Sequence, residues 1–183
     1  SAPEHTLEKA ATAFTETTGM EFHAMGELEY YVIEPDEAVF PVVDQHGYHE
    51  STPFAKTNDF RTACMNCIAQ AGGQIKYGHS EVGSFKLNGL VYEQNEIEFL
   101  PVRVQDTADQ LLIAKWMIRN LAYRKGLNVT FAPKITTGKA GSGLHIHMRM
   151  MKDGRNMMLR NGKLSDDARR MIAGMMDVAP CIT

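Results

Sequence analysis

Residues 139–148 read KAGSGLHIHM, in which the end of a glycine-rich loop is followed by histidines that alternate with apolar residues. Successive side chains of a β-strand point to opposite faces of the sheet. His145 and His147 therefore share one face, and the apolar residues around them share the other. This stretch predicts a strand with a core-facing side and a side that carries imidazole ligands.

The same alternation occurs in two other stretches. Glu27 and Glu29 are two residues apart, as are Glu96 and Glu98, and Glu81 ends a short His-Ser-Glu run. Any one of these pairs also fits a solvated sheet face, and a His pair also fits packing or hydrogen bonding. Together they would crowd carboxylates, which repel and raise one another's pKa unless a divalent cation binds. Carboxylates with one imidazole suit Mg²⁺ or Mn²⁺. The residues alone therefore predict a metal-dependent phosphoryl-transfer or hydrolytic enzyme.

Helical and strand patterns alternate along the whole chain. The expected helices cover residues 3–18, 58–71, 107–125 and 165–179, and the expected strands cover residues 22–33, 74–81, 90–100, 128–134 and 144–151. Thr107 and Gln110 predict a capping box at the start of the third helix. Lys152-Asp153-Gly154 predicts a hairpin turn, and Ser165 is expected to cap the last helix. The mixture, with at least one hairpin, favours an α+β fold over a doubly wound one.

Composition limits the class of protein. The chain has 183 residues, 44% of them hydrophobic, and a net charge of −3, which fits one domain spanning residues 1–183. The spread of Lys and Arg predicts no nucleic-acid partner, and no apolar run predicts a membrane span. The odd set of cysteines, Cys64, Cys67 and Cys181, predicts a cytoplasmic protein. Cys64 and Cys67 form a C-x-x-C inside a predicted helix, where burial is expected rather than redox or zinc chemistry.

Several segments, taken in order, resemble the catalytic domain of the glutamine synthetase family. They are MGELEY at residues 25–30, HSEV at residues 79–82, QNE at residues 94–96, TFAPK at residues 130–134 and KAGSGLHIHM at residues 139–148. The resemblance covers nearly the whole chain. It implies an α+β fold of the glutamine synthetase/guanido kinase type, with a largely antiparallel sheet and helices packed on one face.

The resemblance also implies a reaction and two metal ions. In that family ATP phosphorylates the side-chain carboxylate of glutamate, and ammonia then displaces phosphate to give glutamine. Mg²⁺ or Mn²⁺ would be held by residues that match the family's ligands: Glu29, Glu81 and Glu96 for the first ion, and Glu27 and His145 for the second. The other roles implied are substrate binding for Ala140, Gly141 and Gly143, and nucleotide or phosphate binding for His79 and His147.

Three features depart from the family's pattern. Ala140 stands where the loop usually has an Asn that helps to hold glutamate, and Arg149 replaces a small polar residue. The distance from Glu81 to the next ligand is longer than usual, and residues 84–90 resemble an inserted hairpin loop. Glu98 therefore competes with Glu96 for the role of ligand.

Parts of the family's enzyme do not appear in these residues. The resemblance places an N-terminal β-rich domain, which supplies an Asp for ammonium deprotonation, before Ser1, and substrate-binding arginines and a last glutamate ligand beyond Thr183. Ser1-Ala2 is interpreted as a tag remnant. We therefore expect the chain alone to be inactive and to be a monomer or a small assembly, while the whole enzyme forms a homo-oligomeric ring. Two alternatives stay open: a ligase that joins glutamate to a larger amine such as a polyamine, and a non-catalytic protein of the same fold.

Overall fold

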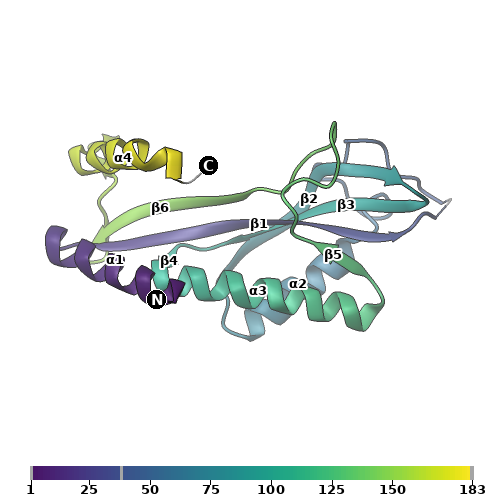
Figure 1. Ribbon diagram of the computed structural model, residues 1–183, viewed down its shortest axis with the longest axis horizontal. Coiled ribbons are helices and arrows are strands. Elements are labelled where there is room, and N and C mark those ends of the chain that lie inside the picture. Colours follow the sequence, from purple (N-terminus) through teal and green to yellow (C-terminus); the bar gives the residue numbers. More distant parts are fainter. Residues whose placement is uncertain (1, 38, 182–183) are drawn as a thin grey trace. The chain divides into compact units, whose positions relative to one another are not determined.

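The computed structural model describes residues 2–37 and 39–181. The helices are α1 (Pro3–Thr18), α2 (Asn58–Gln70), α3 (Val104–Lys125), α4 (Asp166–Val178) and the short 3₁₀ helix η1 (Ala179–Cys181). The strands are β1 (Glu21–Pro35), β2 (Ile75–Leu87), β3 (Leu90–Phe99), β4 (Val102–Arg103), β5 (Asn128–Thr130), β6 (Leu144–Lys152), β7 (Arg155–Asn156), β8 (Leu159–Arg160) and β9 (Lys163–Leu164). The predicted order of helices and strands is confirmed (Figure 1).

The chain divides into two compact units. The first comprises Ser1–Ala24, Pro101–Thr107 and His147–Thr183, and the second comprises Met25–Leu100 and Ala108–Ile146. Strands β1 and β6 and helix α3 run from one unit into the other. The main sheet has the order β2-β3-β1-β6-β7, with β4 and β5 also paired to β1. Every residue of the predicted metal sites lies in the second unit.

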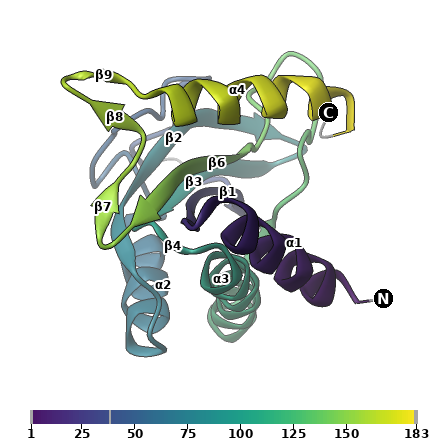
Figure 2. The ribbon, with the colours of Figure 1, turned by 90° about the vertical axis from the view of Figure 1, so that its left-hand side faces the viewer.

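The second unit is an antiparallel sheet whose one face is covered by α2 and α3 (Figure 2). Alternation places the apolar residues of β1 and β3 on that face, where they meet one stripe from each helix. The buried cluster consists of Leu28, Tyr30, Val32, Phe60, Cys64, Ile68, Ile97, Phe99, Leu111, Ala114, Ile118 and Ala122. Leu111, Ala114, Ile118 and Ala122 form the buried stripe of α3. The predicted burial is confirmed for Cys64, whereas Cys67 is only partly buried. The opposite face of the same strands is left for polar residues.

Strands β2 and β3 form a hairpin with two distinctive features. Asn88 and Gly89 make its turn, both with positive φ (53° and 77°), as a two-residue hairpin turn of the Asn-Gly kind requires. Further along, Ser80 pairs with Asn95 but Ser84 pairs with Glu93, so residues 81–83 oppose one residue of β3. The extra residues that we expected as an inserted loop are therefore a regular extension of both strands, because each residue from 84 to 87 pairs across the hairpin.

Two local predictions are wrong. Helix α3 begins at Val104, so Thr107 lies within its first turn, and its hydroxyl donates to the carbonyl oxygen of Ala24 at 2.7 Å. Gln110 accepts from the backbone N–H of Gln74 at 3.1 Å, so these two residues join the helix to other segments and form no capping box. Strand β5 ends at Thr130 rather than residue 134, because Pro133 lacks the N–H that a ladder needs.

The first unit contains the local signals that the sequence predicted most simply. Gly19 adopts the left-handed conformation (φ 66°) that ends α1. Asp153 and Gly154 form the turn between β6 and β7, and the Ser165 side chain accepts from the backbone N–H of Ala168 at the start of α4. Within residues 2–37 and 39–181, no helix is both long and apolar enough to cross a membrane.

Candidate metal centre

The strand register brings the predicted carboxylates together on the face opposite the helices. Glu29 lies directly opposite Glu96, and Glu27 lies opposite Glu98, across the antiparallel pair of β1 and β3. On the other side of β3, His79 of β2 pairs with Glu96. Side chains at such paired positions are about 5 Å apart at their Cβ atoms. Residues that are up to 71 positions apart in the sequence thus form one cluster centred on Glu96.

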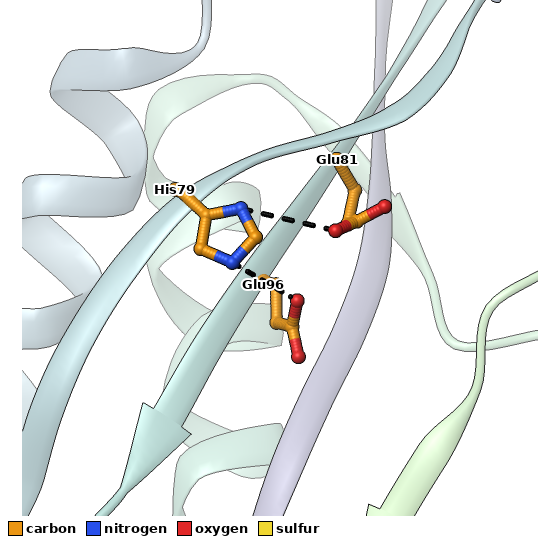
Figure 3. Close-up of side chains that lie close together, drawn as sticks. All are labelled: His79, Glu81 and Glu96. Atoms are coloured by element: carbon orange, nitrogen blue, oxygen red, sulfur yellow. Dashed lines mark ion pairs between the residues drawn. The ribbon is translucent and has the colours of Figure 1, made fainter. Parts of the chain in front are cut away.

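Figure 3 shows His79, Glu81 and Glu96, which offer one ligand atom each within 4.8 Å of one another. His79 Nε2 lies 3.1 Å from Glu96 Oε2, and His79 Nδ1 lies 3.8 Å from Glu81 Oε1. His79 Nδ1 also lies 3.0 Å from the carbonyl oxygen of Ser80, so it carries a hydrogen. The imidazole of His79 thus lies between the carboxylates of Glu81 and Glu96.

Glu96 is a buried carboxylate whose negative charge is poorly balanced by its surroundings. Its side chain is buried, and burial raises its pKa to about 8, together with repulsion from Glu27, Glu29, Glu81 and Glu98. Burial disfavours the charged form, and neighbouring negative charges add to that effect. A cation bound beside Glu96 would reverse both effects.

Glu98 is equally buried but has a different environment. Although burial alone would raise its pKa, hydrogen bonds from Lys76 and Tyr77 and the charges of Lys76 and His79 outweigh that effect and lower the pKa. Lys76 Nζ lies 2.7 Å from Glu98 Oε2. Glu98 also has an oxygen within 4.8 Å of oxygens of Glu27 and Glu96. Its negative charge is already balanced by Lys76, so the geometry favours Glu96 over Glu98 as the metal ligand.

Glu27, Glu29 and His145 lie on the other side of the cluster. His145 Nδ1 lies 3.0 Å from Glu27 Oε2 and 3.9 Å from Glu29 Oε1. The imidazole is largely exposed, whereas both carboxylates are mostly covered. An accessible imidazole against two carboxylates fits the ligand chemistry of a divalent cation.

The glycine loop runs close to these ligands. A Cβ on Gly143 would lie 2.9 Å from His145 Nε2 and 3.1 Å from Glu29 Oε1, and a Cβ on Gly141 would lie 2.5 Å from the carbonyl oxygen of Pro133. The backbone N–H of Gly143 donates to Glu29 Oε2 at 3.0 Å. Only glycine lets the backbone approach the ligands so closely. This contact supports the expected place of Gly143 beside the ligands, whereas Gly141 lies against Pro133.

Two other predicted residues have different surroundings. Ala140 is held through its backbone, because its carbonyl accepts from the Tyr31 hydroxyl at 2.8 Å and its N–H donates to Gln45 Oε1 at 2.7 Å. His147 lies on β6 in the first unit with an exposed side chain. Its nucleotide role therefore stays a prediction.

Sequence reasoning missed two residues that organise the loop. Gln94 lies two residues before Glu96 and therefore on the same face of β3, and its amide contacts both Glu29 and Gly141. Gln45 lies in the irregular segment between β1 and α2, has a positive φ and holds Ala140. The motif around Glu96 contained a signal for Gln94, whereas no sequence pattern marks Gln45.

The antiparallel sheet, with helices on one face and carboxylates on the other, defines an α+β protein with a candidate divalent-cation site. A family model described as "Glutamine synthetase, catalytic domain" matches residues 1–183. The chain belongs to the glutamine synthetase family.

Individual relatives agree with this family. The chain is 31% identical over 180 residues to the glutamine synthetase of Methanosarcina mazei and 32% identical over 181 residues to that of Clostridium saccharobutylicum. Each alignment covers 95% of the chain, but only 38% and 39% of those relatives, so the chain spans about two fifths of their length.

Solved structures show the same fold. The cryo-EM structure of Plasmodium falciparum glutamine synthetase superposes with a TM-score of 0.82 at 18% identity, over 96% of this chain and 40% of that one. The GmaS/ADP complex superposes with a TM-score of 0.81 at 22% identity, over 97% of this chain and 41% of that one. Likeness at this level of identity establishes the fold of the chain.

Proposed function

We propose that the chain carries the metal-binding part of the active site of a glutamate–ammonia ligase. In this assignment Glu29, Glu81 and Glu96 hold one Mg²⁺ or Mn²⁺ ion, and Glu27 and His145 hold a second. The substrates of the whole enzyme are glutamate, ammonia and ATP, and its product is glutamine. The observation that carries the proposal is the convergence of β1, β2 and β3 on Glu96, with His145 of β6 against Glu27 and Glu29, in a protein of this family.

The donor set fits divalent cations. Carboxylate oxygens with an imidazole are typical Mg²⁺ and Mn²⁺ ligands, and the raised pKa of Glu96 marks a buried carboxylate that lacks positive charge. A larger residue in place of Gly143 would press on the side chains of Glu29 and His145. When bound, the ions would neutralise phosphate oxygens and stabilise the charge that develops in phosphoryl transfer.

The residues of the chain itself then bind and orient the substrates. The Gly143 N–H fixes one oxygen of Glu29, and glutamate binding is assigned to the backbone of Gly141, whose carbonyl accepts from the Gln94 amide that also holds Glu29. His79, held by Ser80 and Glu96, provides an imidazole for the transferred phosphate. His147 is assigned to the nucleotide. The reaction then has two parts: ATP phosphorylates the side-chain carboxylate of glutamate and leaves as ADP, and ammonia then displaces phosphate from this acyl phosphate to give glutamine.

A calorimetric Mn²⁺ titration tests the proposal on this chain. We expect saturable binding that Glu29→Ala abolishes. Glu34→Ala is the matched control, because Glu34 lies on the same strand, opposite Val91, and outside the cluster. Equal binding by the native chain and Glu29→Ala, or no Mn²⁺ binding by the native chain, would contradict the assignment.

One observation favours a second function of the same class. Ala140 brings only a methyl group to the loop position where the family usually has Asn, and the loop is held there by backbone contacts. This suits a ligase that joins glutamate to a larger amine. ADP release by the whole enzyme in the presence of ammonia, methylamine or a polyamine distinguishes the two functions. Ammonia alone should support release if the first proposal is correct.

The remaining family properties are proposals for the whole enzyme: a cytoplasmic location and a homo-oligomeric ring. We also propose that residues 1–183 form no glutamine by themselves, since they span about two fifths of the relatives. Glutamine formation by the purified chain, followed with ATP, glutamate and ammonia, would contradict that statement.

A further inference from the structure

The side chain of Gln94 is almost completely buried, 1% exposed, between the carboxylate cluster around Glu96 and the glycine loop. Its Nε2 donates to Glu29 Oε2 at 2.7 Å and to the carbonyl oxygen of Gly141 at 2.9 Å. Its Oε1 accepts from the backbone N–H of Gly83 at 3.0 Å. One amide therefore joins three segments: β1, the glycine loop and the bulged part of β2.

These partners determine the orientation of the amide. Two acceptors, a carboxylate and a carbonyl, require the NH₂ group on one side, and the Gly83 N–H requires the oxygen on the other. Both N–H hydrogens of Gln94 are thereby used. No other uncharged side chain of this length offers two donors and one acceptor in a plane, so the position demands glutamine.

The contacts also separate the two oxygens of Glu29. Oε2 accepts from both Gln94 and the N–H of Gly143, whereas Oε1 is the oxygen that lies 3.9 Å from His145 Nδ1. A carboxylate whose one oxygen is held by two donors presents the other oxygen to a cation. Residues that hydrogen-bond to a metal ligand fix the orientation of that ligand, and their loss commonly lowers metal affinity about 10–100-fold.

We infer that Gln94 is a positioning residue that turns Glu29 Oε1 toward the metal and couples metal binding to the conformation of the glycine loop. The inference rests on the proposed metal function. Because the same NH₂ group holds Glu29 and Gly141, a change in the charge at Glu29 alters the hydrogen bond to the loop. Metal binding and substrate binding through the loop are then energetically linked, as any two events that share one contact must be.

Two glutamines of this chain allow a matched test. Gln45 also holds the loop, through the Ala140 N–H, but it has no contact with Glu29 in the described structure. Gln94→Met and Gln45→Met each replace an amide with an apolar side chain of similar length. Mn²⁺ affinity by calorimetry reports on Glu29. The amide resonance of Ser142, whose nitrogen is bonded to the Gly141 carbonyl carbon, reports on the loop as Mg²⁺ is added.

We expect Gln94→Met to weaken Mn²⁺ binding about 10–100-fold and to remove the Mg²⁺-dependent shift of Ser142. Gln45→Met should retain that shift and bind Mn²⁺ within about threefold of the native chain. Circular dichroism confirms that each variant is folded. If Gln94→Met is unfolded, Gln94→Asn takes its place, since its amide is one methylene too short to reach all three partners.

The possible outcomes distinguish a failure of the role of Gln94 from a failure of the proposed metal site. Native affinity in folded Gln94→Met, or an equal loss in Gln45→Met, overturns the role of Gln94 and leaves the metal site in place. Absence of Mn²⁺ binding by the native chain overturns the proposed function, and the role of Gln94 with it.

Discussion

The two faces of strands β1 and β3 are built from alternate residues of the same segments, yet they serve different purposes. On one face Leu28, Ile97 and Phe99 pack against α2 and α3 and are almost completely buried. On the other face Glu29 and Glu96 lie opposite each other. Apolar burial stabilises the first face, whereas the second concentrates charge that destabilises the protein until it is neutralised. Stability and binding should therefore respond to separate substitutions, one residue apart.

The largest expected effect is on the apolar face. Ile97→Ala removes a fully buried side chain and should lower the free energy of unfolding by about 2–5 kcal/mol, through lost apolar burial and the cavity left behind. Urea denaturation followed by circular dichroism measures this change. Below the unfolding transition, Mn²⁺ affinity should stay within about threefold of native. A large loss of affinity in the folded variant would show that the two faces are not independent.

The next effect is on the charged face, one residue away. Glu96→Gln removes a proposed ligand while preserving shape, and it should weaken Mn²⁺ binding by at least about 100-fold, or about 2.7 kcal/mol, which exceeds the usual loss for an indirect contact. The metal-free variant should unfold no more easily than the native chain above pH 8, because it lacks the repelled carboxylate. Unchanged Mn²⁺ affinity would remove Glu96 from the ligand set.

The pH dependence of Mn²⁺ binding tests the charged face in a second way. The pKa of Glu96 is raised to about 8, so the metal-free site is protonated near neutral pH and a cation must displace that proton. Mn²⁺ affinity should therefore rise up to about tenfold per pH unit between pH 6 and 8, or 1.4 kcal/mol, and level off above pH 8. Calorimetry in two buffers of different ionisation enthalpy should show release of about one proton at pH 7.

The same raised pKa has a consequence for the metal-free protein. Between the ordinary pKa of an unfolded glutamate and about 8, the folded state binds this proton more tightly, so the contribution of Glu96 to stability falls as the pH rises. Affinity that does not vary between pH 6 and 8 would contradict the assigned proton.

The smallest expected effect concerns Glu98, two residues beyond Glu96 on the same face. Glu98→Gln breaks the ion pair with Lys76, which is partly exposed, and should lower the free energy of unfolding by about 1 kcal/mol or less. Mn²⁺ affinity should change by less than about threefold, and its pH dependence should persist. A loss of affinity as large as that of Glu96→Gln would make Glu98 the ligand instead.

Most of the fold could be predicted because the local signals agree with the final structure. The alternation in β1 and β3, the stripe of α3 and the glycine at the end of α1 each depend on neighbouring residues. The start of α3 could not be predicted in this way, because Thr107 and Gln110 match a capping box yet contact Ala24 and Gln74 instead. Tertiary contacts, rather than local capping, determine where α3 begins.

The candidate metal site also combines features that local sequence patterns predict with features that depend on long-range contacts. Alternation placed Glu96 and Glu98 on one face, but their different pKa shifts depend on Lys76 and on the pairing of β2 with β3, which no local pattern reveals. The register that sets Glu29 against Glu96 is likewise a long-range property. Gln45 lies in an irregular segment, and its contact with the loop exists only in the folded chain.

The bulge in β2 gives the hairpin a built-in tolerance of changes in length. Residues 81–83 oppose Gln94 alone, so the ladder before Ser80 and the ladder after Ser84 keep independent registers. Strand residues added or lost at the Asn88–Gly89 end lengthen or shorten the hairpin without shifting His79 against Glu96. The two-strand extension in this chain is such a change, and it leaves the carboxylate cluster in register. For a protein engineer, the tip of this hairpin is therefore a place to insert sequence while the metal ligands stay where they are.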